Sequence, residues 1–292
     1  MIKKKIFVTG VSSSLMTSLC RIIDFEKFEV VGLTRDKGLI QIRNVTIIEG
    51  DIFEIKQFEN YIDNCDIIIH AAAITHSFNK NLYFKTNLEA TKKLVDIVKK
   101  QETKKFIFIS SNTANKANGS YSESKFLAEK YIQENLKNWL SIRISEVYGT
   151  NSNYGIDGLI NNAFQNSILF YPMDIPFKLS PIYIDDAVNV IYKAIFVKNH
   201  TNIIFGINGK VKYSFANLAK EIKKRKKGKL FLIPINKNIM FFIMNLTKLI
   251  PFFIGVIPDQ IERLYGEKSY RESDSNSYMN IESYISKLTR VK

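Results

Sequence analysis

Residues 5–16 read KIFVTGVSSSLM, an apolar run that ends in Thr9-Gly10 and is followed by a second apolar segment. This order is typical of a strand that passes through a glycine turn into a helix, whose free N–H groups form an anion site. A complete dinucleotide-binding fingerprint has three glycines. Here only Gly10 is present, and Ser13 and Met16 stand in the second and third places. The motif alone therefore leaves open a phosphate-binding loop or a plain strand–turn–helix unit.

The same alternation continues through the first half of the chain. Further short runs rich in Ile, Val and Phe lie at Val30–Leu33, Val45–Ile48, Ile67–Ile69, Phe106–Ile109 and Leu140–Ile144. Helical patterns lie between several of them, at Leu15–Ile23, Leu88–Lys100 and Ser122–Leu136. Nearly continuous apolar runs are typical of strands buried on both faces. The sequence thus predicts an α/β fold with a doubly wound parallel sheet and a ligand site at the carboxyl ends of its strands.

The pattern changes after Gly149. Residues 151–158 are expected to form a turn-rich loop. Beyond it we expect strands at Ile182–Ile184, Ile203–Ile207 and Leu230–Ile233, and helices at Asp186–Val197 and from Ser214. These features predict a nucleotide-binding domain over 1–150 and a smaller C-terminal lobe over 151–292, partly interleaved with the first sheet.

The chain has 292 residues and a formal net charge of +14. Most lysines are scattered, which favours solvated faces over a nucleic-acid partner. Cys20 and Cys65 lack metal-ligand spacing and fit buried thiols in a reducing compartment. The N-terminus lacks the long apolar core of a signal peptide. We therefore expect a cytoplasmic protein without a metal site.

One apolar stretch leaves two interpretations open. Residues 239–257 are strongly apolar but are broken by Asn245, Lys248 and Pro251, and the basic run 223–229 lies close before them. Such a segment can lie in a bilayer interface, and a lipid-linked sugar would then be a fitting substrate. The alternative is a core helix of the lobe or a homodimer contact.

The chemistry-bearing residues gather after the fifth predicted strand, which ends in Ser110-Ser111. Tyr121 and Lys125 follow at the start of a helix, four residues apart and hence on one helix face. A phenol of ordinary pKa near 10 is a poor base at neutral pH. A lysine ammonium about 4 Å away would stabilise the phenolate by roughly 4 kcal/mol at an effective dielectric of 20. We therefore expect Tyr121 to act as the proton-transfer group and Ser111 to hold the substrate oxygen.

Cofactor contacts are expected at the ends of the other strands. Thr34 stands where an acidic residue would bind a ribose 2′-hydroxyl, and Arg35 could instead meet a 2′-phosphate. Asp51 could accept from an adenine amino group or cap the following helix. The small residues Ala71, Ala72 and Ala73 would let a cofactor lie against the backbone, and Asn87 could fix a neighbouring main chain.

Taken in order, these pieces resemble the extended short-chain dehydrogenase/reductase family, the NAD-dependent epimerase/dehydratases. The matching pieces are Thr9-Gly10, Asp51, His70–Ala73, Asn87 with Thr91, Ser110-Ser111, Tyr121 and Lys125, Arg143 with Tyr148-Gly149, and Asp185-Asp186. The resemblance implies a Rossmann domain and a lobe that binds a nucleotide sugar. It implies a catalytic triad of Ser111, Tyr121 and Lys125. It also implies that NAD or NADP binds at Gly10, Ser13, Arg35, Asp51, Ala72, Asn87 and Lys125.

The resemblance also narrows the reaction. Dehydratases of this family carry Thr-Asp-Glu after the fifth strand, whereas residues 111–113 here are Ser-Asn-Thr. This leaves 4-epimerisation of a UDP- or dTDP-linked sugar, or reduction of a 4-keto sugar, in surface-polysaccharide synthesis. Arg35 favours an NADPH-dependent reductase, and the incomplete glycine loop favours a non-catalytic dinucleotide-binding regulator. Lys178 is the one cation near the place where many family epimerases hold the nucleotide phosphates with arginine.

Overall fold

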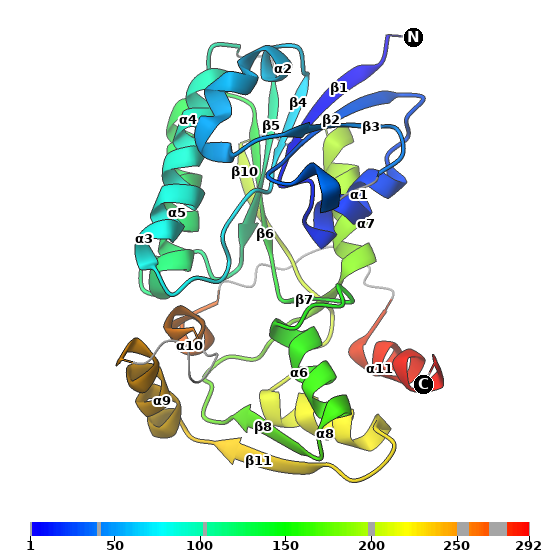
Figure 1. The fold of residues 1–292 in the computed structure, drawn as a ribbon, viewed down its shortest axis with the longest axis vertical. Coiled ribbons are helices and arrows are strands. Elements are labelled where there is room, and N and C mark those ends of the chain that lie inside the picture. Colours follow the sequence, from blue (N-terminus) through cyan, green and yellow to red (C-terminus); the bar gives the residue numbers. More distant parts are fainter. Residues whose placement is uncertain are drawn as a thin grey trace.

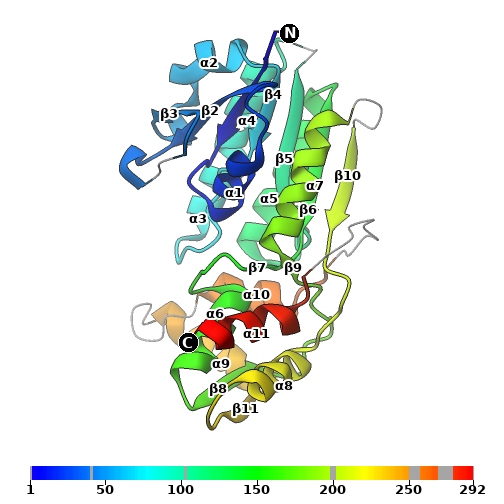
Figure 2. The ribbon, with the colours of Figure 1, turned by 90° about the vertical axis from the view of Figure 1, so that its right-hand side faces the viewer.

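The computed structural model describes residues 2–39, 42–101, 104–197, 202–249, 257–268 and 279–291. It has two parts, an α/β domain at one end and a smaller lobe at the other (Figure 1). Seen from the side, the strands of the larger part point their carboxyl ends toward the lobe (Figure 2). The region between the two parts is therefore where a parallel sheet of this kind places its ligands.

The central sheet has seven parallel strands in the order β10-β6-β5-β4-β1-β2-β3. They are β1 (Lys4–Thr9), β2 (Phe28–Thr34), β3 (Val45–Glu49), β4 (Ile67–His70), β5 (Lys105–Ser111), β6 (Trp139–Ile144) and β10 (Ile203–Ile207). The order reverses between β1 and β4, which is the switch point of a Rossmann-type sheet. This confirms the predicted fold class.

Helices cover both faces of the sheet, which explains the continuous apolar runs. Ile6 and Val8 of β1 belong to one core, and Phe7 between them belongs to the other. The first core includes residues of α1 (Ser14–Ile22) and α7 (Ile184–Phe196), and the second those of α2 (Glu59–Asp63), α4 (Ala90–Val98) and α5 (Gly119–Asn135). Shorter turns are η1 (Lys37–Leu39), η2 (Ile52–Phe58), α3 (Lys80–Tyr83) and η3 (Phe84–Glu89).

The larger part is not built from residues 1–150 alone. β10 pairs with β6 along residues 203–207, and α7 packs against α1. The chain thus returns to the first domain after entering the lobe. Residue 150 is therefore not a boundary of the central sheet, and the division of the chain into domains stays a prediction.

The lobe has its own core, formed mainly by residues of α6 (Gly155–Gln165), α8 (Phe215–Arg225) and α11 (Ile281–Val291). Its parallel two-stranded sheet joins β8 (Ile168–Pro172) and β11 (Phe231–Ile235), and α9 (Lys237–Leu249) and α10 (Pro258–Tyr265) follow. β7 (Val147–Tyr148) and β9 (Ile182–Tyr183) pair at the junction. The prediction of a loop over 151–158 is wrong for its second half, because α6 begins at Gly155.

Cys20 and Cys65 are buried free thiols, as predicted, and burial raises their pKa values to about 12 and about 11. The apolar stretch 239–257 forms α9 up to Leu249, and residues 250–256 lie outside the described part. No helix of the described residues is long and apolar enough to cross a membrane.

Candidate active site

Gly10 ends β1 and turns the chain toward α1. Its φ is +68°, a conformation that L side chains rarely adopt. A Cβ at this position would lie 2.8 Å from both Cα and N of Ala72, at the end of β4. The turn therefore depends on glycine at residue 10, because it packs directly on the Ala72 backbone. The structure brings these two predicted cofactor residues together at the switch point.

Ser13 and Met16, which stand in place of the second and third glycines, have defined contacts. Ser13 is the N-cap of α1, and its Oγ accepts a 3.3 Å hydrogen bond from the Met16 N–H. Met16 is fully buried in the core between α1 and the sheet. On β2, a Cβ at Gly32 would come within 2.9 Å of the Val11 side chain. The turn between β1 and α1 thus packs closely on β2, because Gly32 leaves room for the Val11 side chain.

A buried series of hydrogen bonds joins β1, β4 and α4 close to the Gly10 turn. Thr91 Oγ1 donates to the Asn87 carbonyl (2.7 Å) and lies 2.8 Å from His70 Nε2, which must then carry the proton. His70 Nδ1 consequently accepts from Thr9 Oγ1 at 2.6 Å. Burial, with the Lys125 charge, lowers the pKa of His70 to about 3. His70 is therefore a neutral structural histidine.

The residues expected at the adenosine end lie at the outer strands. Arg35 is exposed directly after β2, whereas Thr34 is buried and bonds the Asp36 backbone. Asp51 caps η2, since its Oδ1 accepts from Phe53 N at 3.0 Å. The capping interpretation of Asp51 is confirmed, and its contact with adenine stays a prediction, as does that of Arg35 with a phosphate.

Asn87 ties the β4 loop to the catalytic helix. Its Oδ1 accepts from Ile74 N (2.8 Å), and its Nδ2 donates to Ile74 O (3.0 Å) and to Ser124 Oγ (3.1 Å). Ser124 in turn donates to the Tyr121 carbonyl at 2.7 Å. Asn87 thus fixes a neighbouring main chain, as expected, and aligns α5 with β4.

Lys125 is almost fully buried on α5, with its ammonium 4.0 Å from the centre of the Phe108 ring. Burial lowers the pKa of Lys125 to about 7, although the carboxylate of Glu129 opposes the shift. Glu129 itself is held by Arg143 and Ser141. Among the described residues, no oxygen accepts a hydrogen bond from this ammonium. Its three donors are therefore free for a polar ligand.

Ser111 and Tyr121 meet at the carboxyl end of β5. The Ser111 hydroxyl is near enough to the Tyr121 phenol to lower its pKa, and it lies 2.9 Å from Thr113 Oγ1. Thr113 is held in turn by the Ser122 hydroxyl at 3.0 Å. The structure thus brings the predicted triad members Ser111 and Tyr121 close together, and Thr113 stands at the second of the two positions that are acidic in dehydratases.

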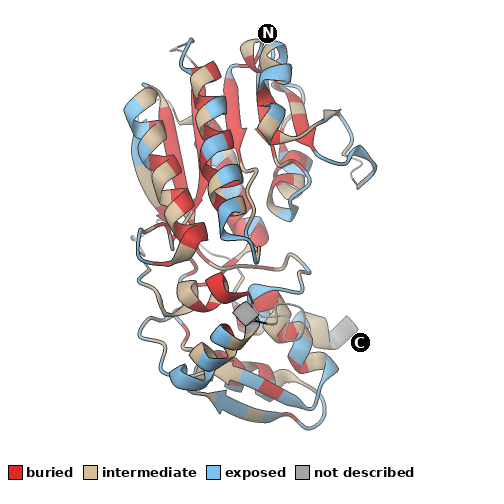
Figure 3. Cartoon of the chain, turned by 60° about the vertical axis from the view of Figure 1, so that its left-hand side comes forward, coloured by how far each residue is buried: buried red, intermediate tan, exposed pale blue. Residues whose placement is uncertain are grey.

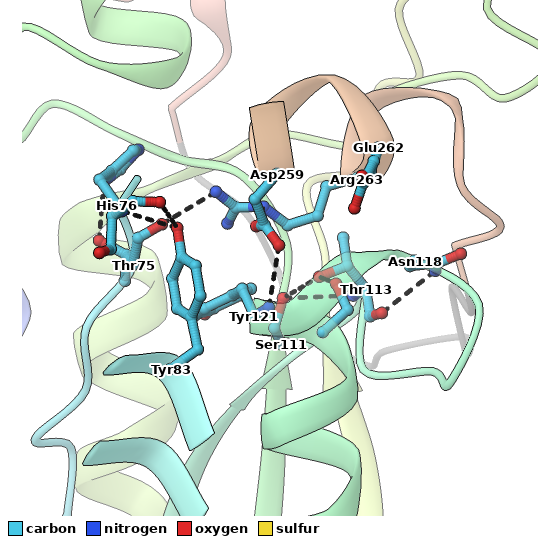
Figure 4. A network of polar contacts seen from close by, with 12 residues as sticks. Thr75, His76, Tyr83, Ser111, Thr113, Asn118, Tyr121, Asp259, Glu262 and Arg263 are labelled. Atoms are coloured by element: carbon cyan, nitrogen blue, oxygen red, sulfur yellow. Dashed lines mark hydrogen bonds and ion pairs between the residues drawn. The ribbon is translucent and has the colours of Figure 1, made fainter. Parts of the chain in front are cut away.

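The cation that faces Tyr121 is Arg263 of α10, a residue that the sequence analysis missed (Figure 4). Its guanidinium carbon lies 4.4 Å from the centre of the Tyr121 ring. Burial raises the pKa of Tyr121, while the Arg263 charge and the Ser111 hydrogen bond lower it and Asp259 raises it. That Lys125 stabilises the Tyr121 phenolate stays a prediction.

Asp259, one turn before Arg263, contacts both partners. Its Oδ1 accepts from Tyr121 N at 3.1 Å, near the start of α5, where the N-cap residue Asn118 makes no side-chain cap bond. Its Oδ2 lies 2.9 Å from Arg263 Nε, but the N–H is not aimed at it, so this contact is an ion pair without a hydrogen bond. The i,i+4 spacing of an acid and a base was the only signal in the sequence.

Residues of the lobe also contact the loop that follows β4. Arg263 Nη2 donates to Thr75 O at 2.9 Å (Figure 4). The His76 ring stacks on Tyr154 with centroids 4.4 Å apart. Burial and the Arg263 charge lower the pKa of His76 to about 4. The site is therefore enclosed by residues from both parts of the molecule.

Two other acidic residues have structural contacts. Asp157 of α6 accepts from Gly149 N (2.9 Å) and Thr150 N (2.8 Å), which fixes the loop after β7. Asp186 lies within the first turn of α7, and Met279 N donates to it at 3.4 Å. Asp186 thus contacts the C-terminal segment.

The sequence model of the NAD dependent epimerase/dehydratase family matches residues 6–204. The chain belongs to this family. This is the family that its motifs resemble. Curated relatives match in part only: an uncharacterized membrane protein of Methanocaldococcus jannaschii is 26% identical over 142 residues, 44% of this chain and 42% of the relative. The chain spans less than half the length of this relative.

Solved structures of epimerases and reductases share the fold. UDP-glucuronic acid 4-epimerase from Bacillus cereus, in complex with UDP-glucuronic acid and NAD, superposes with a TM-score of 0.72 at 19% identity, covering 97% of this chain and 99% of that one. dTDP-4-dehydrorhamnose reductase from Bacillus anthracis, in complex with NADP, gives 0.68 at 20% identity, covering 82% and 86%. At these identities the likeness establishes the fold of this family member.

Proposed function

We propose that the protein is a 4-epimerase of a UDP- or dTDP-linked sugar that uses a tightly held NAD(P) and passes through a transient 4-keto intermediate. The observation that carries this proposal is the enclosed pair of Ser111 and Tyr121, with Arg263 against the phenol ring. A hydroxyl donor beside an acid–base phenol suits reversible proton transfer at a sugar hydroxyl. The substrate class is supported by the solved structures of similar fold, which include epimerases in complex with UDP-sugars.

The residues present fit a dinucleotide. The Gly10 turn packs on Ala72 at the switch point, and the buried ammonium of Lys125 faces no oxygen acceptor among the described side chains and carbonyls. Ribose hydroxyls would supply the missing acceptors. When bound, the oxidised cofactor would supply the hydride acceptor.

In the proposed reaction, the protein's own residues move and stabilise a proton. In its phenolate form, Tyr121 takes the proton of the sugar 4-hydroxyl, and the hydride leaves the same carbon. The Ser111 hydroxyl donates a hydrogen bond to the oxygen that becomes the ketone. Tyr121 then returns the proton after the ring has turned over and been reduced on its other face. Arg263 opposes the effect of burial by stabilising the phenolate.

A second candidate is a reductase that consumes NADPH on a 4-keto sugar. The exposed Arg35, with Thr34 in the place of an acidic residue, favours a 2′-phosphate. In this reaction Tyr121 would give a proton to the ketone oxygen, and the hydride of NADPH would remain on the product. Net oxidation of NADPH separates this reaction from epimerisation.

The deciding experiment is to denature the purified protein and identify the nicotinamide nucleotide released. Stoichiometric NAD, with interconversion of UDP-sugar 4-epimers that Tyr121→Phe abolishes, supports the epimerase. An empty protein that binds and oxidises NADPH with a 4-keto sugar supports the reductase. Failure to bind either nucleotide contradicts both and favours a non-catalytic regulator.

A further inference from the structure

The end of the lobe farthest from the nucleotide-binding domain presents an apolar sheet face. β8 and β11 run parallel, with Ile168 beside Phe231 and Phe170 beside Ile233. All four side chains are exposed, Phe170 by 55% and Phe231 by 60%. Figures 1 and 3 show this sheet at the tip of the lobe, with exposed positions on its strands. Soluble proteins seldom expose several large apolar side chains side by side without a binding role.

The opposite face of the same sheet is part of the lobe core. Leu169 is buried and Leu232 packs against the core cluster, and both strands contact α8. Because side chains alternate along a strand, the apolar character of the exposed face is not a by-product of core formation. The sheet is apolar on both faces, and only one of them is used within the chain.

The apolar residues continue into α9, which begins two residues after β11. Ile239 and Phe242 lie on the exposed face of this helix, and Phe242 is 69% exposed. The two positions are three apart and therefore neighbours on the helix surface. The exposed apolar residues of β8, β11 and α9 are called the tip surface here, defined as Ile168, Phe170, Phe231, Ile233, Ile239 and Phe242.

Lysines flank the tip surface. Lys223 and Lys224 are exposed in the last turn of α8, and Lys227 and Lys229 are exposed between α8 and β11. Lys229 lies two residues before Phe231, at the entry to β11. Between Lys223 and Pro258 the sequence contains eight lysines and arginines and no acidic residue. The apolar surface therefore carries an unbalanced positive border.

We propose that the tip surface docks the protein on a bilayer that contains anionic phospholipid. Aromatic and aliphatic side chains would enter the headgroup boundary while the lysines meet phosphate groups, a combination that produces interfacial binding. Charge decides against a second copy of this chain, because two such borders would bring like charges together. The inference goes beyond the proposed reaction and does not depend on it.

The test is flotation of the purified full-length chain with vesicles of phosphatidylcholine alone or of equal parts phosphatidylcholine and phosphatidylglycerol. We expect flotation with the anionic vesicles only. Lys227→Gln with Lys229→Gln should weaken it by roughly 25-fold, at about 1 kcal/mol per lysine and 1.4 kcal/mol per tenfold. Phe170→Ser with Phe231→Ser should weaken it by about 30-fold or more, since two large apolar side chains leave the interface.

Matched controls come from the other domain. Tyr61 of α2 is 45% exposed, and Lys3 and Lys56 are exposed, all far from the lobe. Tyr61→Ser, and Lys3→Gln with Lys56→Gln, should leave flotation unchanged. Circular dichroism checks that every variant is folded. As a local probe, Phe231→Trp should show a blue-shifted emission with anionic vesicles that Tyr61→Trp does not.

Two results would overturn the proposal. One is failure to float with anionic vesicles, or equal flotation of wild type and both tip-surface variants. The other is a dimer in solution that Phe170→Ser with Phe231→Ser converts to a monomer while vesicle binding is absent, which would make the surface a contact between copies.

Discussion

The Arg263 guanidinium lies 4.4 Å from the centre of the Tyr121 ring, and Asp259 contacts both residues. Arg263 and Asp259 come from α10 in the lobe, whereas Tyr121 belongs to the nucleotide-binding domain. The charge state of the candidate catalytic phenol therefore depends on the position of a lobe helix. Docking of α10 onto α5 completes the site.

Replacing Arg263 by glutamine should slow turnover at neutral pH. Arg263 lowers the pKa of Tyr121 against the effect of burial. Without it the phenolate is less populated, so the rising limb of the pH–rate profile should move to higher pH. Because the ring contact is also present with the neutral phenol, the loss of rate should follow only the smaller fraction of phenolate at each pH. Steady-state kinetics over a pH series measures both effects.

Arg263→Lys is the matched control, because it keeps the charge and loses the planar stacking. It should recover most of the pH profile, while dinucleotide affinity should be unchanged in both variants. A purely structural role for Arg263 predicts instead that both variants lose activity with no displacement of the pH profile.

Asp259 should stabilise the start of α5. Its Oδ1 accepts from Tyr121 N, as a helix cap would, and its Oδ2 balances Arg263. Asp259→Ala removes both contacts and should lower the unfolding free energy by about 1–3 kcal/mol. Thermal melting should fall by about 2–4 °C per kcal/mol. Asp259→Asn keeps the backbone acceptor and should cost less than Asp259→Ala; equal losses would argue against the cap.

The sheet could be predicted from sequence because its signal is local. Runs such as Ile67–Ile69 and Ile203–Ile207 are apolar on both sides, and the structure confirms each as a strand with bounds shifted by at most a few residues. Ser111, Tyr121 and Asn87 were found because their spacing follows strand ends and helix starts. Gly10 was found because a tight turn needs it.

The lobe contacts could not be predicted in the same way. Arg263 meets Tyr121 across a separation of 142 residues, and nothing in residues 258–265 indicates which helix they pack against. β8 was missed because Ile168–Pro172 is short and its partner β11 lies 63 residues later. The partner of Lys125 also depends on packing, since the Phe108 ring that its ammonium faces lies on another element.

Gly10→Ala should impair both stability and dinucleotide binding. Alanine at residue 10 would have to adopt an unfavourable positive φ. Its Cβ would lie 2.8 Å from the Ala72 backbone, which cannot move without displacing β4. Gly155 provides a close control, because its φ is +61° but nothing lies within 4 Å of a Cβ there. We expect Gly155→Ala to cost about 1–2 kcal/mol of unfolding free energy, from the backbone conformation alone. Gly10→Ala should cost more and should also reduce NAD(P)H affinity in a fluorescence titration, which Gly155→Ala should not.

Lys125→Met should stabilise the protein near neutral pH while abolishing activity. The folded-state pKa of Lys125 is about 7, against an ordinary value of 10.5, because the side chain is buried. Between these values the unfolded chain binds more protons than the folded one, so wild-type stability should rise with pH through this window.

In Lys125→Met that rise is missing. Its advantage in unfolding free energy over wild type should therefore shrink by about 2 kcal/mol between roughly pH 7.5 and 9.5. Urea unfolding of both proteins at the two pH values measures this difference, and groups shared by the two proteins cancel. Lys130→Met, an exposed position on the same helix, controls for the loss of a lysine as such. If the advantage of Lys125→Met stays constant with pH, the pKa of Lys125 is not lowered in the folded protein.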